Sequence, residues 1–541
     1  MKLNIGSTDS LAEPLPQFRE FRAPRGHGER LIQPELSRAG QSISENRERA
    51  EAYPPELSSL RADARAQLLR DAGRYTSAYR NVGPVPTADA RIVMAGHQPE
   101  LFHPGVWFKN FALDHVASAT ASVAINLVVD SDVSGVNSIR VPSLSAHDGS
   151  IGYTTVRYDR GTAGVPYEQS LVQDRQLFDT FDQRVAEALA GIVSRPSVVP
   201  LWRHAREAIQ RCGFAGCALA QARHGLEAEL GLNTLEIPQS VVCRSDAFAS
   251  FAMHILRDLP RYHRCYNGSA DRYRLAHGIR SNAHPVPNLR TEGDWWEAPF
   301  WLYGNQSPRR RSVWVRLSRG GKTMEISDRD KRLRTIENAD DPSADAAFAS
   351  LSSPEFKLRS RALVTTMYAR LVLSDLFLHG IGGGKYDQLG DLISAAFWNL
   401  QPPEMMVISA TALLPQAESH SPRDIEQALA ALKRRRRDLV YQPERFADSG
   451  ELPDQLIEEK RSLLASIPAR GHRSQWHHQL TELNRQMSSR LRHIEAELDQ
   501  QFQQLERRSR AASIWNSREH PFCIYPLAGL QDTFRSMLHV G

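Results

Sequence analysis

Two short apolar segments, separated by about one helix, constrain the fold of this chain more than any other feature. The first is residues 91–95, and the second is SVAINLVVDSD, residues 122–132, which is almost continuously apolar before it ends in carboxylates. A strand that is buried on both faces of a parallel sheet has this composition. Residues 111–120, between them, are typical of a helix. Strand, helix and strand in this order form a βαβ unit, whose crossover is almost always right-handed.

Similar patterns along the chain predict an α/β fold in which a Rossmann-like core carries a parallel sheet. Further strands are expected at residues 240–244, 298–304, 310–327 and 403–416. The third of these turns at Gly320 and Gly321, which is typical of a β-hairpin. Residues 358–379 are expected to form one long helix that ends at the glycine-rich stretch GIGGGK.

Changes in composition divide the chain of 541 residues into four expected segments. They are an N-terminal arm with helices at residues 1–88, the Rossmann-like catalytic or binding core at 89–415, a helical coiled-coil hairpin at 416–512, and a segment at 513–541 that docks back on the core. The length agrees with such a division, because a chain of this size is too long for one simple core.

A regular apolar stripe characterises the hairpin segment. Its members are spaced by three or four residues: Leu480, Leu483, Met487, Leu491, Ile494, Leu498, Phe502 and Leu505. This spacing predicts a long helix packed against a partner helix. Prolines interrupt the preceding arm, so we expect a second copy of the chain to complete the cover, as a homodimer through residues 420–512. The alternative is a solvent-facing helical bundle without a partner.

The charge balance does not favour nucleic acid as the main partner. The net charge is +5, and the sharpest basic run, KRRRR at residues 433–437, is followed by acidic residues and lacks interleaved aromatic side chains. The chain also lacks the run of about 20 apolar residues that a membrane helix requires, and its start does not resemble a secretory signal. We expect a cytoplasmic protein that does not enter the membrane.

The five cysteines do not predict a disulfide framework, because their number is odd and the chain is long. Cys212 and Cys217 are separated by four residues, with His204 and His224 outside them. A zinc site is one interpretation, but the spacing matches no standard ligand set. We favour a structural role within a largely helical segment, and no metal site is predicted.

The segment MAGHQPELFHPGVWFKN, which follows the first strand, contains side chains suited to substrate binding. His97 can exchange a proton near neutral pH, and Gln98 offers both a donor and an acceptor. His103 lies in the same loop, and Lys109 can meet a phosphate or a carboxylate. Ligands of open parallel sheets bind outside the carboxyl ends of the strands, where this loop begins. The alternative is that both histidines satisfy buried backbone groups beside the two prolines.

Asp130 and Asp132 stand at the end of the second strand. Residues two apart in an extended strand point to the same side, so these carboxylates are expected to bind an ammonium group, to share a proton or to hold magnesium through waters. Asn137 follows closely and would add a polar group to the pocket. Alternatively, one of the carboxylates caps the next helix or turn.

A glycine-rich turn, HGIGGGKYDQ, is a candidate site for an anionic part of a ligand. It is not a P-loop, because one residue is missing between its glycines and Tyr386 replaces the Ser or Thr. Gly382, Gly383 and Gly384 would let backbone amides approach a ligand, with Lys385 and Tyr386 at the rim. A plain glycine C-cap is the alternative, and it accounts for one glycine rather than four.

These motifs together resemble those of the bacillithiol-biosynthesis cysteine-adding enzymes. AGHQPELFHPGVWFKN stands where that family has a TGQQxGLFTGPLYTxxK-like loop, and VDSDVSGVNS resembles in part its EDHDFxEVNH-like motif. HGIGGGKYDQ resembles its VGGPGEIAYxxQ-like turn, and IYPLAGLQDTF resembles its LFPxGxLQER-like tail. The four motifs keep the family's order and span most of the chain. The loop alone also resembles the HQPxYLPWxGYFxK opening of WbqC-like proteins.

The resemblance implies a Rossmann-like core, a dimerising coiled-coil hairpin and a ligase. That ligase would add cysteine or a similar amino acid to a small amino-sugar-type acceptor, as in the synthesis of bacillithiol-type low-molecular-weight thiols. In this role His97 would act as a general base, Asp130 and Asp132 would hold the amine, and Gln98 and Asn137 would orient polar groups.

Departures from the family pattern support a second interpretation. Ser131 stands in place of the family's central His, and Val129 in place of the preceding Glu. The alternative function is therefore a non-catalytic scaffold that binds a nucleotide or metabolite, dimerises and recruits a partner through its coiled coil. The cofactor is unknown, with ATP or ADP as the candidate, and a small molecule is the expected substrate.

Overall fold

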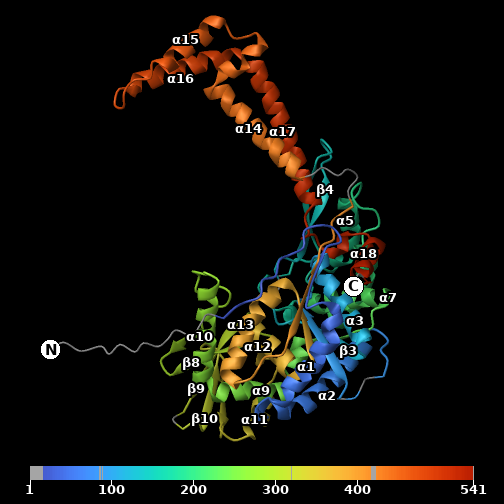
Figure 1. The fold of residues 1–541 in the computed structure, drawn as a ribbon. Coiled ribbons are helices and arrows are strands. Elements are labelled where there is room, and N and C mark those ends of the chain that lie inside the picture. Colours follow the sequence, from blue (N-terminus) through green and yellow to red (C-terminus); the bar gives the residue numbers. More distant parts are fainter. Residues whose placement is uncertain are drawn as a thin grey trace, which may run out of the picture.

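The computed structural model describes residues 16–84, 87, 89–133, 135–161, 163–318, 320–415 and 422–539. Figure 1 shows a body that contains the sheets and a helical arm that projects from one end of it. Residues 1–15 of the expected N-terminal arm and residues 416–421 at the start of the expected hairpin lie outside the described residues.

The central sheet has the strand order β1-β14-β13-β2-β3-β6. Its strands are β1 (Arg30–Gln33), β2 (Arg91–His97), β3 (Ser122–Val128), β6 (Leu235–Pro238), β13 (Leu376–His379) and β14 (Met405–Ala410). All neighbours pair in parallel except β1, which pairs antiparallel with β14. From β2 the chain adds β3 and β6 on one side and later β13 and β14 on the other, so the order reverses between β2 and β13. The predicted mixed α/β fold is confirmed, whereas the Rossmann-like assignment stays a prediction.

Alternating side chains of β2 decide which helices cover each face of this sheet. Val93 belongs to the apolar cluster that contains α3 (Pro104–Ala119). Met94 belongs to the opposite cluster, with α2 (Pro55–Ser77) and α9 (Asp246–Arg257). The predicted βαβ unit is therefore present as β2, α3 and β3.

Helix α3 begins earlier than the predicted residue 111. The ring of His103 accepts a hydrogen bond from the backbone N–H of Gly105 at 3.1 Å, which caps the helix. Pro104 takes the first helical position, where its missing N–H leaves no acceptor unsatisfied. Lys109, expected near the start of this helix, consequently lies in the second turn of α3.

A second, antiparallel sheet lies beside the central one, with the order β11-β10-β9-β8-β12 and β7 paired to β8. Its strands are β7 (Thr291–Glu292), β8 (Trp295–Tyr303), β9 (Arg311–Leu317), β10 (Thr323–Ser327), β11 (Leu333–Glu337) and β12 (Lys357–Ser360). The predicted hairpin is confirmed as β9 and β10, and Gly320 and Gly321 between them have φ of 92° and 74°. Strands β4 (Ser138–Leu144) and β5 (Ile151–Arg157) form a separate pair.

The strand predicted at residues 240–244 is wrong. The strand lies just before it, as β6, and the short helix α8 (Gln239–Val242) follows directly after Pro238. The backbone N–H of Ser240 donates to the carboxylate of Asp130 at 2.9 Å, so a carboxylate caps the start of this helix.

The single helix predicted at residues 358–379 is also wrong. This stretch contains β12, α12 (Ala362–Tyr368), the π-helical turn η3 (Ala369–Leu373) and β13. The helical part ends before Asp375, whose carboxylate accepts the backbone N–H of Ile92 at 2.8 Å and the guanidinium of Arg65 at 2.8 Å. These contacts draw the chain into the sheet, and the glycine-rich stretch then begins helix α13 (Ile381–Trp398) instead of ending one.

The remaining helices of the body surround the two sheets. They are α1 (Ala39–Glu51), α4 (Arg175–Asp179), α5 (Phe181–Ala188), α6 (Val198–Cys212), α7 (Ala215–Glu229), α10 (Leu259–Ala276), α11 (Ala344–Ser350) and α18 (Leu527–His539), with the 3-10 turns η1 (Leu36–Arg38), η2 (Tyr167–Gln169) and η5 (Phe522–Ile524). The C-terminal segment contacts α3, where the ring centroids of Phe522 and Trp107 are 4.4 Å apart and those of Phe534 and Phe111 are 4.9 Å apart.

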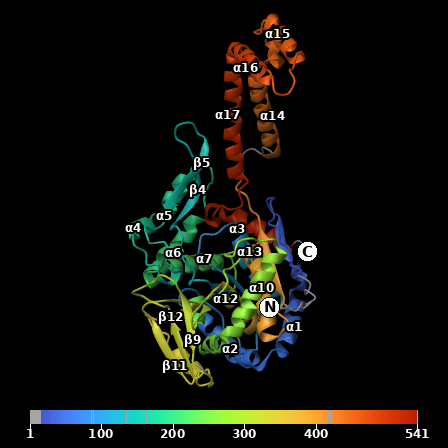
Figure 2. The same cartoon turned by 90° about the vertical axis from the view of Figure 1, so that its left-hand side faces the viewer.

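The described part of the arm, residues 422–515, forms four helices and a 3-10 turn. They are α14 (Pro422–Tyr441), η4 (Pro443–Ser449), α15 (Asp454–Ala465), α16 (Arg473–Arg490) and α17 (Arg492–Trp515). Helices α14 and α17 run side by side away from the body, and α15 and α16 form the far end (Figures 1 and 2). No helix in the described parts of the chain is both long enough and apolar enough to cross a membrane.

The apolar stripe of the arm is largely covered within one chain. Leu483, Met487, Leu491 and Leu498 are buried, and they share a cluster with Leu432, Leu439, Phe446 and Leu452. The stripe also does not lie on one helix, because α16 ends and α17 begins at Leu491, where φ is −96° and ψ is 26°. The stripe therefore does not require a second copy of the chain to cover it. The coiled-coil assignment stays a prediction.

Candidate functional site

Several of the predicted site residues lie at one edge of the central sheet, where β2, β3 and β13 have their carboxyl ends. His97 is the last residue of β2, and Asp130 and Asp132 follow β3. Gly382 to Gly384 lie in the first turn of α13, directly after β13. We call this region the switch-point edge, because the strand order reverses here and open α/β sheets bind their ligands at such points.

The imidazole of His97 is a neutral base at this edge. Its Nδ1 lies 3.1 Å from the backbone oxygen of Gln98. A carbonyl only accepts, so Nδ1 carries the hydrogen and Nε2 keeps its lone pair. Burial lowers the pKa of His97 well below its usual value, and Arg223 and Lys109 lower it further. Nε2 has no hydrogen-bond partner at normal distance and angle within the described residues, and the neighbouring Asn110 side chain raises the pKa of the ring by a smaller amount.

The side chain of Lys109 extends from α3 to the carboxyl end of β2. Its Nζ donates to the backbone oxygen of Gly96 at 2.5 Å, and the residue is 3% exposed. Burial lowers the pKa of this amine to about 7, with a smaller contribution from Arg223. The same amine also lowers the pKa values of His97, on β2, and of His379, on β13. Lys109 is therefore a poorly compensated cation at the centre of the switch-point edge.

The two predicted carboxylates do not act as a pair. Asp130 is buried, accepts the Ser240 N–H at 2.9 Å and its hydroxyl at 2.5 Å, and has its pKa raised to about 7 by burial and then by Glu168. Asp132 instead accepts the amide of Gln98 at 3.1 Å and pairs with Arg310 at 3.1 Å. The reason is that β3 ends at Val128, so the alternation of an extended strand does not reach either residue.

Sequence reasoning missed Arg310, which the second sheet brings to the switch-point edge. Its guanidinium also donates to the backbone oxygen of Ser131 at 3.3 Å and lies 4.8 Å from the ring centroid of Trp301. Arg361 lies 4.1 Å from the same ring. Two guanidinium groups therefore contact one indole beside Asp132. No local signal identifies Arg310, because its partners lie about 180 residues earlier.

The glycines at the start of α13 serve different purposes. A Cβ on Gly384 would collide with the side chain of Val407, and a Cβ on Gly383 would lie 2.8 Å from Nδ1 of His379. Gly382 is exposed, and a Cβ there would meet nothing within 4 Å. Close packing therefore requires glycine at two of the three positions, whereas Gly382 leaves a bare backbone amide at a helix N-terminus, where anions are favoured.

His379 and Asp387 form a second feature that sequence reasoning missed. His379 Nε2 lies 2.9 Å from the Asp387 carboxylate, which also accepts Thr366 and Arg370 at 2.5 Å each. Burial raises the pKa of Asp387, but Arg370 and His379 outweigh it and hold that pKa well below its usual value. Both residues stand in the motif HGIGGGKYDQ, and their pairing depends on the strand-to-helix turn that the sequence patterns did not predict.

The other predicted residues have local roles. His103 caps α3, and burial lowers its pKa. Asn137 accepts the hydroxyl of Tyr158 at 3.4 Å, beside the β4–β5 pair. Lys385 and Tyr386 are exposed on the first turns of α13.

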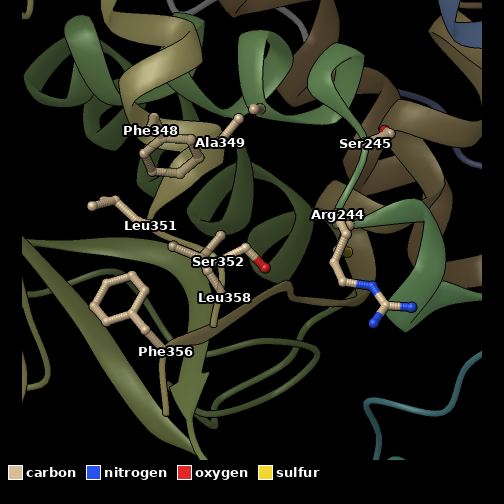
Figure 3. A pocket seen from close by; sticks show the side chains of 10 residues that line it. Arg244, Ser245, Phe348, Ala349, Leu351, Ser352, Phe356 and Leu358 are labelled. Carbon is tan, nitrogen blue, oxygen red and sulfur yellow. The ribbon is translucent and has the colours of Figure 1, made fainter. Parts of the chain in front are cut away.

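A small cavity lies between α9, α11 and β12 (Figure 3). Its lining consists of Cys243, Arg244, Ser245, Ala249, Phe348, Ala349, Leu351, Ser352, Phe356 and Leu358. Its volume is about 20 Å³, which holds about one water molecule. This cavity is too small for a metabolite, and none of the predicted site residues lines it.

The switch-point edge thus combines a neutral imidazole, a buried amine and an exposed helix N-terminus. Such a set can hold an anionic group and accept a proton from a neighbouring nucleophile. Among the described residues, no cluster of three or more His, Cys, Asp or Glu side chains is arranged to hold a metal ion. No family model matches this chain, and no curated protein sequence matches it with significant similarity.

Proposed function

We propose that the protein is a small-molecule ligase whose active site is the switch-point edge. The proposed reaction joins cysteine or a similar amino acid to a small amino-sugar-type acceptor. The observation that carries the proposal is the neutral His97 ring at the place where sheets of this topology bind ligands, with Asn110 as the only side chain that interacts with it by hydrogen bonding among the described residues. The motif order that resembles the cysteine-adding enzymes supports the choice of substrate class.

In this proposal His97 accepts the proton of the attacking group, and Lys109 and the Gly382 amide hold an anionic part of the substrate or of ATP. His97 is 5% exposed, so the reaction requires residues 98–103 to move aside when the substrate binds. Asp132 already pairs with Arg310, so an ammonium group could reach its carboxylate only by displacing that guanidinium.

The test is ligation by purified protein given isotope-labelled cysteine, ATP and the small-molecule fraction of a host extract. Mass spectrometry should detect a new cysteine conjugate, and His97→Gln should lower its rate by roughly 100-fold or more, the usual contribution of a general base. His147→Gln, an exposed change near the β4–β5 turn, is the matched control and should retain the rate. If no conjugate forms with the wild-type protein, the ligase proposal fails.

A non-catalytic scaffold is the second candidate, and the acidic motif favours it. Ser131, in place of the resembled family's His, donates to Gln239 at 2.7 Å in the buried interior, where it has a structural role. Titration calorimetry that shows ADP or ATP binding without any conjugate formation would support the scaffold.

A homodimer through residues 420–512 remains part of the proposal for either function. Its support is now a set of exposed apolar side chains on the arm: Val440, Tyr441, Leu464 and Ile467.

A further inference from the structure

The imidazole ring of His379 lies along the first two turns of α13. Its Nε2 lies 2.9 Å from the carboxylate of Asp387, and its Nδ1 lies 2.8 Å from the position that a Cβ on Gly383 would take. Residues 383 and 387 are four apart in the helix, so they lie one above the other on the same face. The ring therefore spans one turn of α13, with one nitrogen at each end of that turn.

The contact with Asp387 decides which ring nitrogen carries the hydrogen. Arg370 donates to this buried carboxylate at 2.5 Å and keeps it ionised. An ionised carboxylate only accepts hydrogen bonds, so Nε2 of His379 carries the hydrogen and Nδ1 keeps its lone pair. Burial lowers the pKa of His379 below its usual value, although Asp387 opposes this effect, so the ring is neutral near pH 7.

The lone pair of Nδ1 has no partner in the fold. Nδ1 makes no hydrogen bond within the described residues, yet it is not among the fully enclosed side-chain atoms that lack a partner. The 4% of His379 that is exposed therefore includes this nitrogen. Apart from α13 itself, the three atoms nearest to the Cβ position of Gly383 all belong to His379, so no other element approaches this point more closely than the ring does.

The same point lies at the N-terminus of an 18-residue helix. The N–H of Gly384 donates to the backbone oxygen of Gly380 at 2.8 Å, so the preceding N–H groups of Ile381, Gly382 and Gly383 have no acceptor within α13. Free N–H groups at a helix N-terminus favour phosphate oxygens. A buried imidazole with a free lone pair and a row of free donors thus meet at one place.

We propose that His379 is a phosphorylation site that takes the terminal phosphoryl group of a nucleoside triphosphate on Nδ1. The lone pair of Nδ1 attacks the γ-phosphorus, and a nitrogen–phosphorus bond forms. The bond between the γ-phosphorus and the bridging oxygen breaks, and its electron pair leaves with the nucleoside diphosphate. The Nε2 hydrogen stays on the ring, where Asp387 stabilises the positive charge that develops. The free N–H groups of α13 bind the oxygens of the transferred group.

The glycine at position 383 has a direct role in this proposal, because any side chain there would occupy the space in which the phosphoryl group is attached to Nδ1. The competing explanation is that His379 and Asp387 only hold the turn between β13 and α13 in place. His379→Gln separates the two explanations. The terminal amide of glutamine can still donate to Asp387, but it has no nucleophilic nitrogen.

The experiment incubates the full-length protein with magnesium and ATP that carries radioactive phosphorus in its γ-phosphate. The wild-type protein should acquire label that is stable in alkali and lost in acid, as expected for a nitrogen–phosphorus bond, and mass spectrometry should locate it on His379. His379→Gln should lose this label. His147→Gln, an exposed change near the β4–β5 turn, is the matched control and should be labelled like the wild type.

Circular dichroism shows whether His379→Gln has folded, and the position of the label in the wild-type protein decides the question even if this variant has not. A wild-type protein without acid-labile label, or a label that His379→Gln retains, overturns the proposal. The reaction contains neither cysteine nor an acceptor, so its outcome does not depend on whether the protein is a ligase.

Discussion

Burial disfavours the charged form of Lys109, so this residue is expected to make the free energy of unfolding depend on pH. The pKa of its amine is about 7 in the fold, against 10.5 in an exposed lysine. Between these values the unfolded chain binds more protons than the folded one, so this residue makes the free energy of unfolding rise with pH. The cost of burying this amine therefore grows as the pH falls from about 10.5 to about 7 and changes little below that.

Lys109→Met should remove that rise while it keeps the packing. The difference in the free energy of unfolding between the variant and the wild type should favour the variant more at pH 7 than at pH 9. Urea unfolding at both pH values measures this difference. The loss of the donor to Gly96 adds a cost that does not depend on pH. Lys385→Met, on the exposed face of α13, is the control, and equal pH slopes for wild type and Lys109→Met would refute the assignment.

Neighbouring glycines of α13 should respond in opposite ways to the same substitution. Gly382→Ala adds a methyl group in open space, so it should stabilise the protein by about 0.5 kcal/mol while it weakens the binding of an anionic ligand. Gly384→Ala forces a methyl group against Val407 and should destabilise the protein by roughly 1–3 kcal/mol. Thermal unfolding with and without ATP measures both effects. Unchanged ATP affinity in Gly382→Ala would remove this amide from the proposed site.

At the scale of elements, the sequence patterns predicted structure well where one signal dominated. The short run predicted as a strand at residues 122–132 forms β3 over Ser122–Val128, and the hairpin at Gly320 carried its own turn signal. The prediction for residues 358–379 was wrong because short apolar runs such as LVL and LFL suit a helix and a buried strand equally. The deciding contact there joins Asp375 to Ile92, far away in the sequence.

Buried and exposed side chains of the arm should respond differently to a change to glutamate. Leu491 is 0% exposed between α16 and α17, so Leu491→Glu should cost about 3 kcal/mol or more and unfold the arm. Tyr441→Glu with Ile467→Glu changes side chains that are 65% and 54% exposed, so the arm should stay helical. If the arm forms the dimer, light scattering should show this double variant as a monomer. A wild-type protein that is already monomeric at micromolar concentration would refute the dimer.

At the scale of the whole molecule, the candidate site depends on contacts between parts that are distant in the sequence. His97 was identified because it follows a recognisable strand. Arg310 reaches Asp132 only because the connection between β8 and β9 of the second sheet approaches the switch-point edge, and His379 meets Asp387 only after β13 turns into α13. Local patterns therefore predicted the edge and its first histidine, whereas the groups that surround them follow from how the two sheets pack.

The contact between the C-terminal segment and α3 has a consequence for biosynthesis. Trp107 and Phe111 are covered by Phe522 and Phe534, but the whole arm is translated between the end of the central sheet at Ala410 and these residues. At 5–20 residues per second, the ribosome needs on the order of 10 s for that stretch. A nascent chain therefore displays an aromatic patch during this interval, and a chaperone that binds such patches would encounter it before the patch is covered.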